Sequence, residues 1–458
     1  MAEKKSVIVD YTQGNLFRQL MVFALPFILS ALLQNLYSLV DTMVVGQVVG
    51  SGGLSGVSTS GQITGLMTNM VMGFSTAGQV MISQYVGAKK PENLRRTVGT
   101  AFTITTLFAL VLMVVCIGFS NTILRWMNTP AEAFRQARQY LIICSFGFVF
   151  VCGYNTACAI LRGSGDSKRP FAIIAATSIA NLVLDLVFVV GFKMESAGAA
   201  LATVISQAIS MALSMRIFYR HREDFGFTFR LSSFRMDPHE LKLLVRQGVP
   251  LALKSGSISL SGLFINSFIN SYGVTASAAM AVGQKLQHLP NIVTSGFSSA
   301  GMAMIGQNVG AGNYDRVKRI VYINLTICLV LFGVVSVVFL AFPYGFFRLF
   351  TSDEAVLAYA PAFMKVMVVM FVACAFMSPY YAVINGVGNA DFNLIISVLD
   401  GIVLRIGLGL LFGLVFRMGA VGFFLGSALA AFGTTIPAMI YFYSGRWKTF
   451  RLDKSKKA

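Results

Sequence analysis

The stretch QYVGAKKPENLRR at residues 84–96 decides the fold, because the chain repeats it as QNVGAGNYDRVKR at residues 307–319. Each copy stands between two long apolar segments, and the copies lie 223 positions apart. Two short glycine-containing segments, GSGD at 163–166 and GVGN at 386–389, keep the same offset. Several motifs at one offset indicate an internal duplication, so we predict a chain built from two equivalent structural repeats.

Twelve apolar segments surround these motifs, each long enough to cross a membrane as a helix. Their approximate bounds are 17–47, 57–83, 97–119, 135–161, 170–191, 197–219, 245–272, 280–305, 319–343, 357–384, 392–416 and 420–444. The two repeats, residues 1–222 and 223–458, hold six segments each and therefore share one orientation in the membrane. We predict an all-α membrane protein of twelve transmembrane helices, in two six-helix lobes related by pseudo-two-fold symmetry about the membrane normal.

The composition is that of a membrane protein. Of the 458 residues, 56% are hydrophobic and 12% are charged, and the mean hydropathy is +0.72. Soluble domains carry roughly a quarter charged residues, so the composition excludes a disordered chain, a secreted disulfide scaffold and an ordinary soluble enzyme. All six cysteines fall within predicted spans and none forms a Cys-x-x-Cys pair, which argues against disulfides and a zinc site.

The net charge of +18 comes mainly from one side of the predicted membrane protein. The two termini and the loops after the even-numbered spans hold 26 of the 36 Lys and Arg residues, whereas the opposite loops hold six. Because cytoplasmic loops carry the excess of Lys and Arg, we expect a multi-pass cell-membrane protein with both termini in the cytoplasm. The same placement explains the positive charge without a nucleic-acid partner.

A long basic loop, residues 220–246, connects the two repeats. It contains Asp237-Pro238-His239-Glu240, which has the features of a helix start, a capping residue followed by a proline in the first turn. We expect a short amphipathic helix here, on the cytoplasmic side, that leads into the seventh span.

Three aspartates, Asp41, Asp185 and Asp400, lie inside predicted spans. A charged side chain at the centre of a membrane helix costs about 2.5–3.5 kcal/mol, so each aspartate is a candidate functional residue. At about 1.5 Å per residue, Asp41, Asp185 and Thr203 lie at one depth, roughly 9–11 Å below the outer surface. Asn181 precedes Asp185 by one helical turn and shares its face. The sequence therefore predicts a polar cluster in the first repeat.

No Lys or Arg lies at the depth of this cluster in the first repeat. Two close carboxylates at low dielectric constant cannot both stay charged without a partner, so they must hold a proton, a metal cation or a cationic substrate. If the ion is sodium, its oxygen ligands would be Asp41, Asn181, Asp185 and Thr203. We expect H+ or Na+ as the coupling ion, with the proton favoured, and no cofactor.

Polar residues that could line a substrate cavity lie near the cluster. Gln34 and Tyr37 precede Asp41 at helical spacing in the first span and share its face. Tyr154 and Asn155 interrupt the apolar fourth span. We expect the substrate to contact Gln34, Tyr37, Tyr154 and Asn155.

The second repeat has Phe and Leu, rather than acids, at the two positions equivalent to the first-repeat aspartates. It instead carries Lys254, Asp400 and Arg405 within its spans. Lys254 and Asp400 lie about equally far from the cytoplasmic ends of their spans, so we expect them to form a neutralising pair. A structural role for this charge cluster is favoured over a role in transport.

Taken together, the motifs resemble the multidrug and toxic compound extrusion (MATE) family over essentially the full length of the chain. The resemblance rests on QYVGA at 84–88, on LRGSGDSKRP at 161–170 and on NGVGN at 385–389, in a chain of twelve spans. It implies two six-helix lobes and export driven by protons or sodium ions.

Individual residues also match family positions. The cation-site positions of the DinF-like branch are matched by Asp41, Asn181, Asp185 and Thr203. Pro26 matches the proline of a first span that bends in that branch, and a helical proline frees a backbone carbonyl and permits a kink. The acidic site that NorM-like members have in their second lobe is without a match.

These observations predict a secondary active efflux transporter that exports cationic or amphipathic organic compounds by alternating access between two lobes. ATP should not drive it, since the segment 163–166 lacks the Gly-Lys-Ser/Thr ending of a P-loop. We expect a monomer and no enzymatic activity, with the lipid bilayer and a small-molecule substrate as partners.

Three alternatives remain open on the sequence. A flippase for lipid-linked precursors, from the same superfamily, would favour extra spans and a basic cavity for phosphate. A major-facilitator transporter shares the six-plus-six duplication but needs Gly-x-x-x-Asp-Arg after its second span, where residues 87–91 read GAKKP. An intramembrane enzyme would need zinc-ligand His spacing with catalytic acids, or a Ser/Lys or Ser/His dyad at one depth, and we find neither pattern.

Overall fold

The computed structural model describes residues 6–127 and 129–450, and over them the regular structure is entirely helical. The first half has α1 (Leu16–Gly87), α2 (Pro91–Gly118), α3 (Ser120–Trp126), α4 (Ala131–Gly163), α5 (Lys168–Asp185), the π-helix η1 (Leu186–Gly191) and α6 (Glu195–Arg220). A short 3₁₀ turn, η2 (Leu231–Phe234), then precedes α7 (Pro238–Asn270), α8 (Val274–Gly310), α9 (Tyr314–Ala341), α10 (Pro343–Arg348), α11 (Glu354–Leu357) and α12 (Ala360–Val387). The last described elements are α13 (Ala390–Val398), the π-helix η3 (Leu399–Leu404), α14 (Arg405–Leu410), the π-helix η4 (Leu411–Val415), α15 (Gly419–Ala430), α16 (Phe432–Tyr443) and the 3₁₀ turn η5 (Arg446–Lys448).

The duplication predicted from the sequence recurs in the secondary structure. Helices α2 and α9 are both 28 residues long and begin 223 positions apart. The glycine turns behave alike, since Gly165 and Gly388 have φ angles of 97° and 76°, a left-handed conformation that glycine adopts without a steric cost. After each turn a short polar side chain caps the next helix, Asp166 before α5 and Asn389 before α13. The two repeats are thus equivalent at these two places.

The chain forms two compact units. The first unit comprises Met1–Asp10 and Leu25–Gly248, and the second comprises Tyr11–Ala24 and Val249–Ala458. At their edges the units differ from the sequence repeats, since residues 11–24 pack with the second unit and residues 223–248 with the first. Helices α1 and α7 therefore each begin in one unit and continue in the other.

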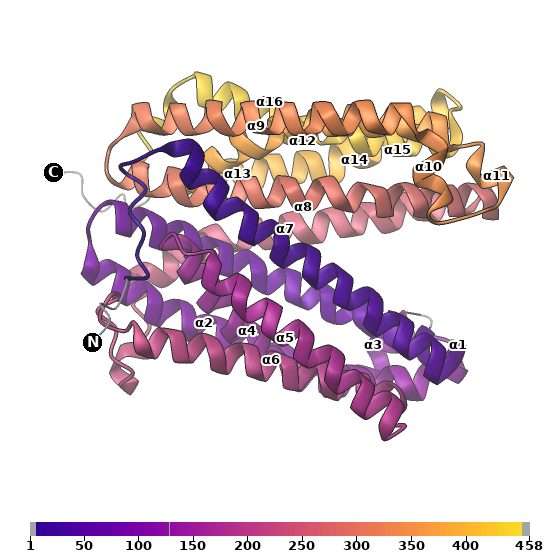
Figure 1. The fold of residues 1–458 in the computed structure, drawn as a ribbon, viewed down its shortest axis with the longest axis horizontal. Coiled ribbons are helices and arrows are strands. Elements are labelled where there is room, and N and C mark those ends of the chain that lie inside the picture. The colour runs from indigo at the N-terminus through magenta and orange to yellow at the C-terminus, as the bar shows by residue number, and fades with distance from the viewer. Residues whose placement is uncertain (1–5, 128, 451–458) are drawn as a thin grey trace. The chain divides into compact units, whose positions relative to one another are not determined.

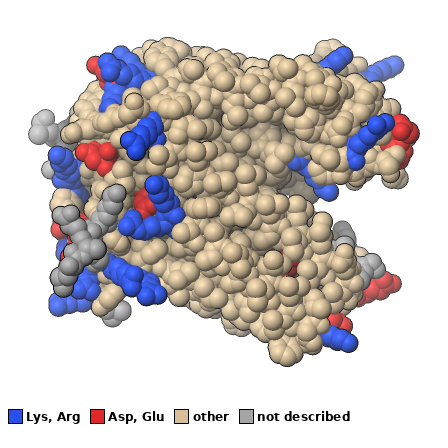
Figure 2. Space-filling model, in the orientation of Figure 1, with Lys and Arg blue, Asp and Glu red and all other residues tan. Residues whose placement is uncertain are grey.

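Ten helices of the described chain are long and apolar enough to cross a membrane. The other two predicted spans, residues 57–83 and 280–305, are helical segments of sufficient length within α1 and α8. They have many Gly, Ser and Thr residues, and those of α8 are largely buried, as expected for membrane helices that pack against other helices. Charged side chains gather at the helix ends and leave a broad band nearly free of charge (Figure 2). The protein is accordingly an all-α membrane protein of twelve spans.

The first two predicted spans both lie within the single element α1, Leu16–Gly87. Gln34 and Thr68 nevertheless line the same cavity, whereas 34 residues of straight helix would separate them by about 51 Å. The chain of α1 therefore doubles back between these two residues, and the two predicted spans run in opposite directions.

In each unit a long helix packs against at least two others. In the first unit α4 packs against α2 and α6, and α5 packs against α6 (Figure 1). In the second unit α12 packs against α8, α9 and α16 (Figure 1). Close approach depends on small residues: a Cβ atom at Gly426 of α15 would collide with the backbone of Gly409 in α14. All six cysteines are buried and free.

The helix start at residues 237–240 has the expected cap but a different extent. The Asp237 carboxylate accepts hydrogen bonds from the backbone N–H groups of His239 and Glu240, at 2.9 and 3.2 Å. Burial acts to raise the pKa of Asp237, but these N–H groups and the Arg96 guanidinium outweigh it and hold the pKa below its usual value. The predicted short helix is the first part of α7, which continues without a break from Pro238 into the seventh span.

Candidate functional site

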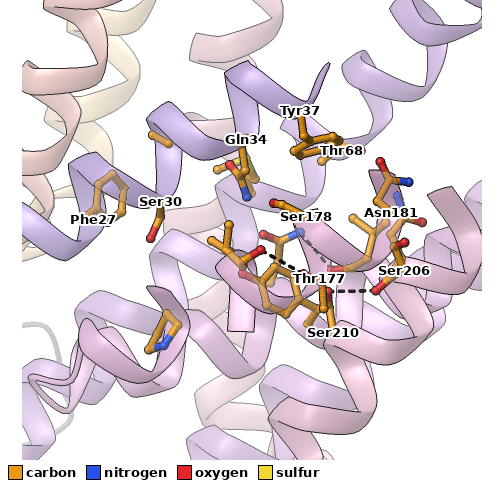
Figure 3. Close-up of a pocket in the computed structure, with 18 of the residues that line it drawn as sticks. Phe27, Ser30, Gln34, Tyr37, Thr68, Thr177, Ser178, Asn181, Ser206 and Ser210 are labelled. Atoms are coloured by element: carbon orange, nitrogen blue, oxygen red, sulfur yellow. Dashed lines mark hydrogen bonds between the residues drawn. The ribbon is translucent and has the colours of Figure 1, made fainter. Parts of the chain in front are cut away.

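A cavity of about 340 Å³ lies in the first unit, among α1, α4, α5 and α6 (Figure 3). Its hydroxyl-bearing lining residues, apart from two tyrosines, are Ser30, Thr68, Ser167, Thr177, Ser178, Thr203, Ser206 and Ser210. Amide side chains come from Gln34, Asn155, Asn181 and Gln207. Among the described lining residues, Arg162 alone carries a formal charge. The cavity therefore offers many neutral hydrogen-bonding groups and a single cation.

Most of the residues singled out in the first repeat meet at this cavity. Gln34 and Tyr37 of α1 approach the cavity opposite Asn181 of α5 (Figure 3). The remaining predicted residues in the lining are Tyr154 and Asn155 of α4 and Thr203 of α6. The helical spacing of Gln34 and Tyr37 predicts that these two side chains share one face of α1. The packing of α4 and α5 against α6 then decides which helices face one another.

The two aspartates lie one helical turn beyond the cavity lining. Asp41 follows Tyr37 by four residues in α1, and Asp185 follows Asn181 by four residues in α5. The carboxyl groups of Asp41 and Asp185 interact electrostatically with each other and with the Tyr37 hydroxyl. The predicted polar cluster is therefore one group of side chains in the first unit.

Both aspartates have oxygen atoms without a hydrogen-bond partner. Asp185 is 1% exposed, and neither of its carboxylate oxygens accepts a hydrogen bond from the described residues. Oδ1 of Asp41 accepts no hydrogen bond from the described residues, and the Asn181 amide nitrogen donates none to them. A buried charge without a partner is costly. Such a pair is therefore suited to hold a proton or a small cation.

An apolar layer borders the aspartates on the side away from the cavity. Val45 lies four residues beyond Asp41, Val189 lies four residues beyond Asp185, and both valines are fully buried. They pack in one cluster with Val57, Tyr140, Cys144, Ala199 and Ala200. The carboxyl groups thus lie between polar side chains at one end and apolar side chains at the other.

Pro26 lies inside α1, next to the cavity-lining residue Phe27. Because proline has no N–H, the carbonyl of Val22 loses its helical partner. The Pro26 carbonyl accepts a hydrogen bond from the Ser30 hydroxyl at 2.7 Å. The helix has a weakened turn at this point, one residue after it passes from the second unit into the first.

Arg162 is a cavity residue that the sequence reasoning missed. Its guanidinium stacks 5.5 Å from the ring centre of Phe27, and its Nε donates to Gln79 at 3.4 Å. The residue belongs to the LRGSGD motif, which the sequence reasoning interpreted as a loop element. A signal was available, since Arg162 follows Tyr154 and Asn155 by two helical turns.

The charge cluster of the second unit is paired differently from the prediction. Asp400 accepts from Arg405 at 3.1 Å and from the Thr434 hydroxyl at 3.0 Å. Lys254 instead lies over the ring of Tyr381, with its Nζ 3.7 Å from the ring centre. The predicted Lys254–Asp400 pair is therefore wrong.

The physical reason is the π-helix η3, Leu399–Leu404. In a π-helix hydrogen bonds connect residues five apart, and this winding brings Arg405 toward Asp400, five positions before it. With α-helical winding those two side chains point about 140° apart, so an α-helical reading of the sequence could not pair them.

Known proteins resemble the chain over both repeats. The MatE family model matches residues 26–187 and 250–411. The probable multidrug resistance protein YoeA of Bacillus subtilis is 30% identical over 353 residues, which are 76% of each chain. The probable multidrug resistance protein YpnP of the same organism is 27% identical, over 98% of this chain and 99% of YpnP.

Solved structures show the same fold. An outward-facing multidrug resistance MATE transporter of the MOP superfamily superposes with a TM-score of 0.88 at 21% identity, over 99% of this chain and 100% of that one. A MOP superfamily transporter from Pyrococcus furiosus, described as having a binding pocket of reverse polarity, superposes with a TM-score of 0.87 at 22% identity and the same coverage.

Proposed function

The chain belongs to the MATE family of transporters, and on that premise we propose that it exports small organic compounds in exchange for an inward-moving cation. One observation carries the proposal: two carboxyl groups with unsatisfied oxygens lie directly beside a polar cavity in the first unit. A proton or cation bound there changes the charge at the cavity end, so ion and substrate compete for one region of the unit. The family is one of membrane transporters and not of enzymes.

We propose cationic or amphipathic organic molecules as the substrates. The cavity volume of about 340 Å³ suits a drug-sized molecule or part of one. Its hydroxyl and amide groups can orient polar atoms, and Phe27, Tyr37 and Met72 give apolar contact surface. The carboxyl pair one turn beyond would attract the positive end of such a molecule.

Protons are the coupling ion that we favour. A proton needs only the two aspartates, whereas sodium needs several oxygen ligands around it. The described candidates for sodium are the carboxylates of Asp41 and Asp185, the amide oxygen of Asn181 and the hydroxyl of Thr203, which itself donates to the Ala199 carbonyl at 2.9 Å. The experiment that tests the coupling ion therefore includes a sodium gradient as well as a proton gradient.

The test is export from proteoliposomes with a proton gradient and a sodium gradient imposed separately. Asp41→Asn keeps the size of the side chain and removes the ionisable group, so it should abolish export driven by the coupling gradient. Asp400→Asn combined with Arg405→Met is the matched control, since it removes a buried aspartate that already has partners together with the charge that it neutralises. Wild-type coupling in a folded Asp41→Asn protein would overturn the proposal.

A flippase for lipid-linked precursors is disfavoured by the cavity. Such a substrate carries phosphate groups, whose recognition calls for several cations. Arg162 is the single cation among the described lining residues, and the carboxyl pair next to the cavity would repel phosphate.

The protein is a multi-pass membrane protein, and we propose that both termini lie in the cytoplasm and that it works as a monomer. Residues 1–5 and 451–458, which contribute to this orientation, lie outside the described residues. The excess of Lys and Arg on the loops after even-numbered spans supports the orientation.

A further inference from the structure

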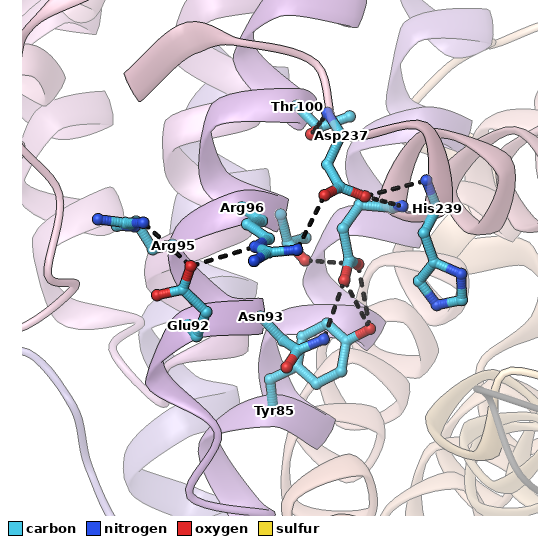
Figure 4. A network of polar contacts seen from close by, with 10 residues as sticks. Tyr85, Glu92, Asn93, Arg95, Arg96, Thr100, Asp237 and His239 are labelled. Atoms are coloured by element: carbon cyan, nitrogen blue, oxygen red, sulfur yellow. Dashed lines mark hydrogen bonds and ion pairs between the residues drawn. The ribbon is translucent and has the colours of Figure 1, made fainter. Parts of the chain in front are cut away.

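The start of α7 is held by residues of the first unit, through a buried carboxylate. Glu240 is 1% exposed. It accepts hydrogen bonds from the Tyr85 hydroxyl at 3.0 Å, the Thr97 hydroxyl at 2.9 Å and the Asn93 amide at 3.2 Å (Figure 4). Tyr85 and Asn93 belong to the repeated element at 84–96. Three neutral donors, two in this element and one directly after it, therefore satisfy the carboxylate that α7 brings here.

The residues just before α7 lie against the same surface of α2. The Asp237 N–H donates to Thr100, and the Asp237 carboxylate pairs with Arg96 at 3.2 Å (Figure 4). The Thr103 hydroxyl donates to the Phe234 carbonyl at 2.6 Å. At Gly99 the fit leaves no room for a side chain, because a Cβ atom there would collide with the Ser233 carbonyl oxygen.

The start of α1 is held in the second unit by the other copy of the element. The Tyr11 N–H donates to the Gln307 side chain at 2.8 Å. The Tyr11 carbonyl accepts from the Asn308 amide at 3.1 Å and from Arg316 at 3.0 Å. Arg316 also donates to the carbonyls of Gln13 and Gly14, at 2.7 and 2.9 Å.

The two arrangements are equivalent in position. Tyr85 and Asn308, Asn93 and Arg316, and Phe234 and Tyr11 are three pairs of residues that each lie 223 positions apart. The chemistry is inverted: the first unit holds a carboxylate with neutral donors, and the second holds backbone carbonyls with a cation. Each unit thus binds the start of the first helix of the opposite repeat.

The chain changes units at equivalent places as well. The changes fall after Ala24 in α1 and after Gly248 in α7, 224 positions apart. A proline follows each change within two residues, Pro26 in α1 and Pro250 in α7. Each proline removes one helical hydrogen bond and makes bending easier there than in the docked segments.

We propose that two equivalent surfaces, residues 85–103 and 307–316, are reciprocal docking sites. The first keeps the start of α7 fixed to the first unit, and the second keeps the start of α1 fixed to the second unit, throughout transport. In α7, movement is then taken up by bending next to Pro250. Glu240 and Arg316 are positioning residues in this arrangement. The proposal requires neither a particular substrate nor a particular coupling ion.

The first experiment releases the docked segments. Glu240→Ala and Arg316→Ala are compared with Glu223→Ala and Lys318→Ala, which remove exposed or half-exposed charges nearby. Amide hydrogen exchange, read in full-length protein in nanodiscs, should accelerate by about tenfold at residues 231–240 in Glu240→Ala and at residues 11–16 in Arg316→Ala. The controls should stay within about twofold of wild type. Unchanged exchange in both Ala variants would overturn the docking.

The second experiment asks whether docking persists while the protein works. Arg96→Cys and Asp237→Cys replace an ion pair at the docking site, and a short thiol-reactive cross-linker then joins the two positions. The cross-linked protein should export a dye at least as fast as the same variant before cross-linking, since the link replaces a contact that never opens. Export that stops on cross-linking would mean that the segment undocks in each cycle, and would overturn the proposal.

The third experiment tests the bending point. Pro250→Ala restores a helical hydrogen bond in α7 and should slow export several-fold, while leaving exchange at residues 231–240 unchanged. Export at the wild-type rate would overturn the assignment of bending to this turn. If the wild-type protein exports no tested compound, the proposed function fails, whereas the exchange measurements still decide whether the segments are docked.

Discussion

Two buried aspartates should respond in opposite directions to the same substitution by leucine. Asp185 is 1% exposed and receives no hydrogen bond from the described residues, whereas Asp400 is 2% exposed and accepts from Arg405 and Thr434. Leucine has a similar size and no polar atom. It is also the residue that the second repeat has, as Leu408, at the position equivalent to Asp185.

The magnitudes follow from the contacts. A buried polar atom without a partner costs about 1–3 kcal/mol, so Asp185→Leu should raise the free energy of unfolding by that amount. Asp400→Leu should lower it by about 3–5 kcal/mol, because Arg405 is then a buried charge without a partner. The Arg405 side chain is 14% exposed, which leaves it little access to solvent.

The assay is thermal unfolding of purified protein in lipid nanodiscs, combined with export from proteoliposomes. Asp185→Leu should be more stable than wild type and inactive in gradient-driven export. Asp400→Leu should be less stable, and adding Arg405→Met should restore most of the loss because no unpaired charge remains. A destabilised Asp185→Leu protein, or an Asp400→Leu protein as stable as wild type, would refute the reasoning.

Three further predictions concern other parts of the chain. A cysteine at Ser232, in the loop between the repeats, should react with a membrane-impermeant reagent in inside-out vesicles but not in intact cells; labelling of intact cells contradicts the orientation. Arg162→Gln should slow export of a rhodamine dye with a free carboxylate by about tenfold relative to its methyl ester, since a hydrogen bond to a charged group contributes about 1.5–3 kcal/mol; equal effects on both dyes would exclude contact with the substrate. Tyr381→Leu should lower the free energy of unfolding by about 0.5–2 kcal/mol through loss of the cation–π contact with Lys254, whereas Tyr381→Phe, which keeps a ring, should have little effect.

Part of the candidate site could be predicted because it follows the α-helical period. Asn181 and Asp185, or Tyr37 and Asp41, share a face at a spacing of four residues wherever the helix is regular. Distance from the span ends then places Asp41 and Asp185 at one depth. Arg162 and the partner of Asp400 escaped prediction. Arg162 lies about four helical turns from the depth of the aspartates. The pairing of Asp400 with Arg405 depends on π-helical winding, which no residue pattern predicts.

The sequence by itself determined the duplication, the positions of the twelve spans and the residues that carry charge into the membrane. These features depend on hydropathy, on helical periodicity and on the offset of 223 residues, all of which can be read along one chain. Only the tertiary structure decided that residues 11–24 pack with the second unit and that residues 223–248 pack with the first. It also decided which polar faces line one cavity. The physical reason is that such contacts join segments far apart along the chain, as the hydrogen bond between Tyr11 and Gln307 shows. They depend on complementary shapes and hydrogen-bonding groups, which cannot be read from either segment alone.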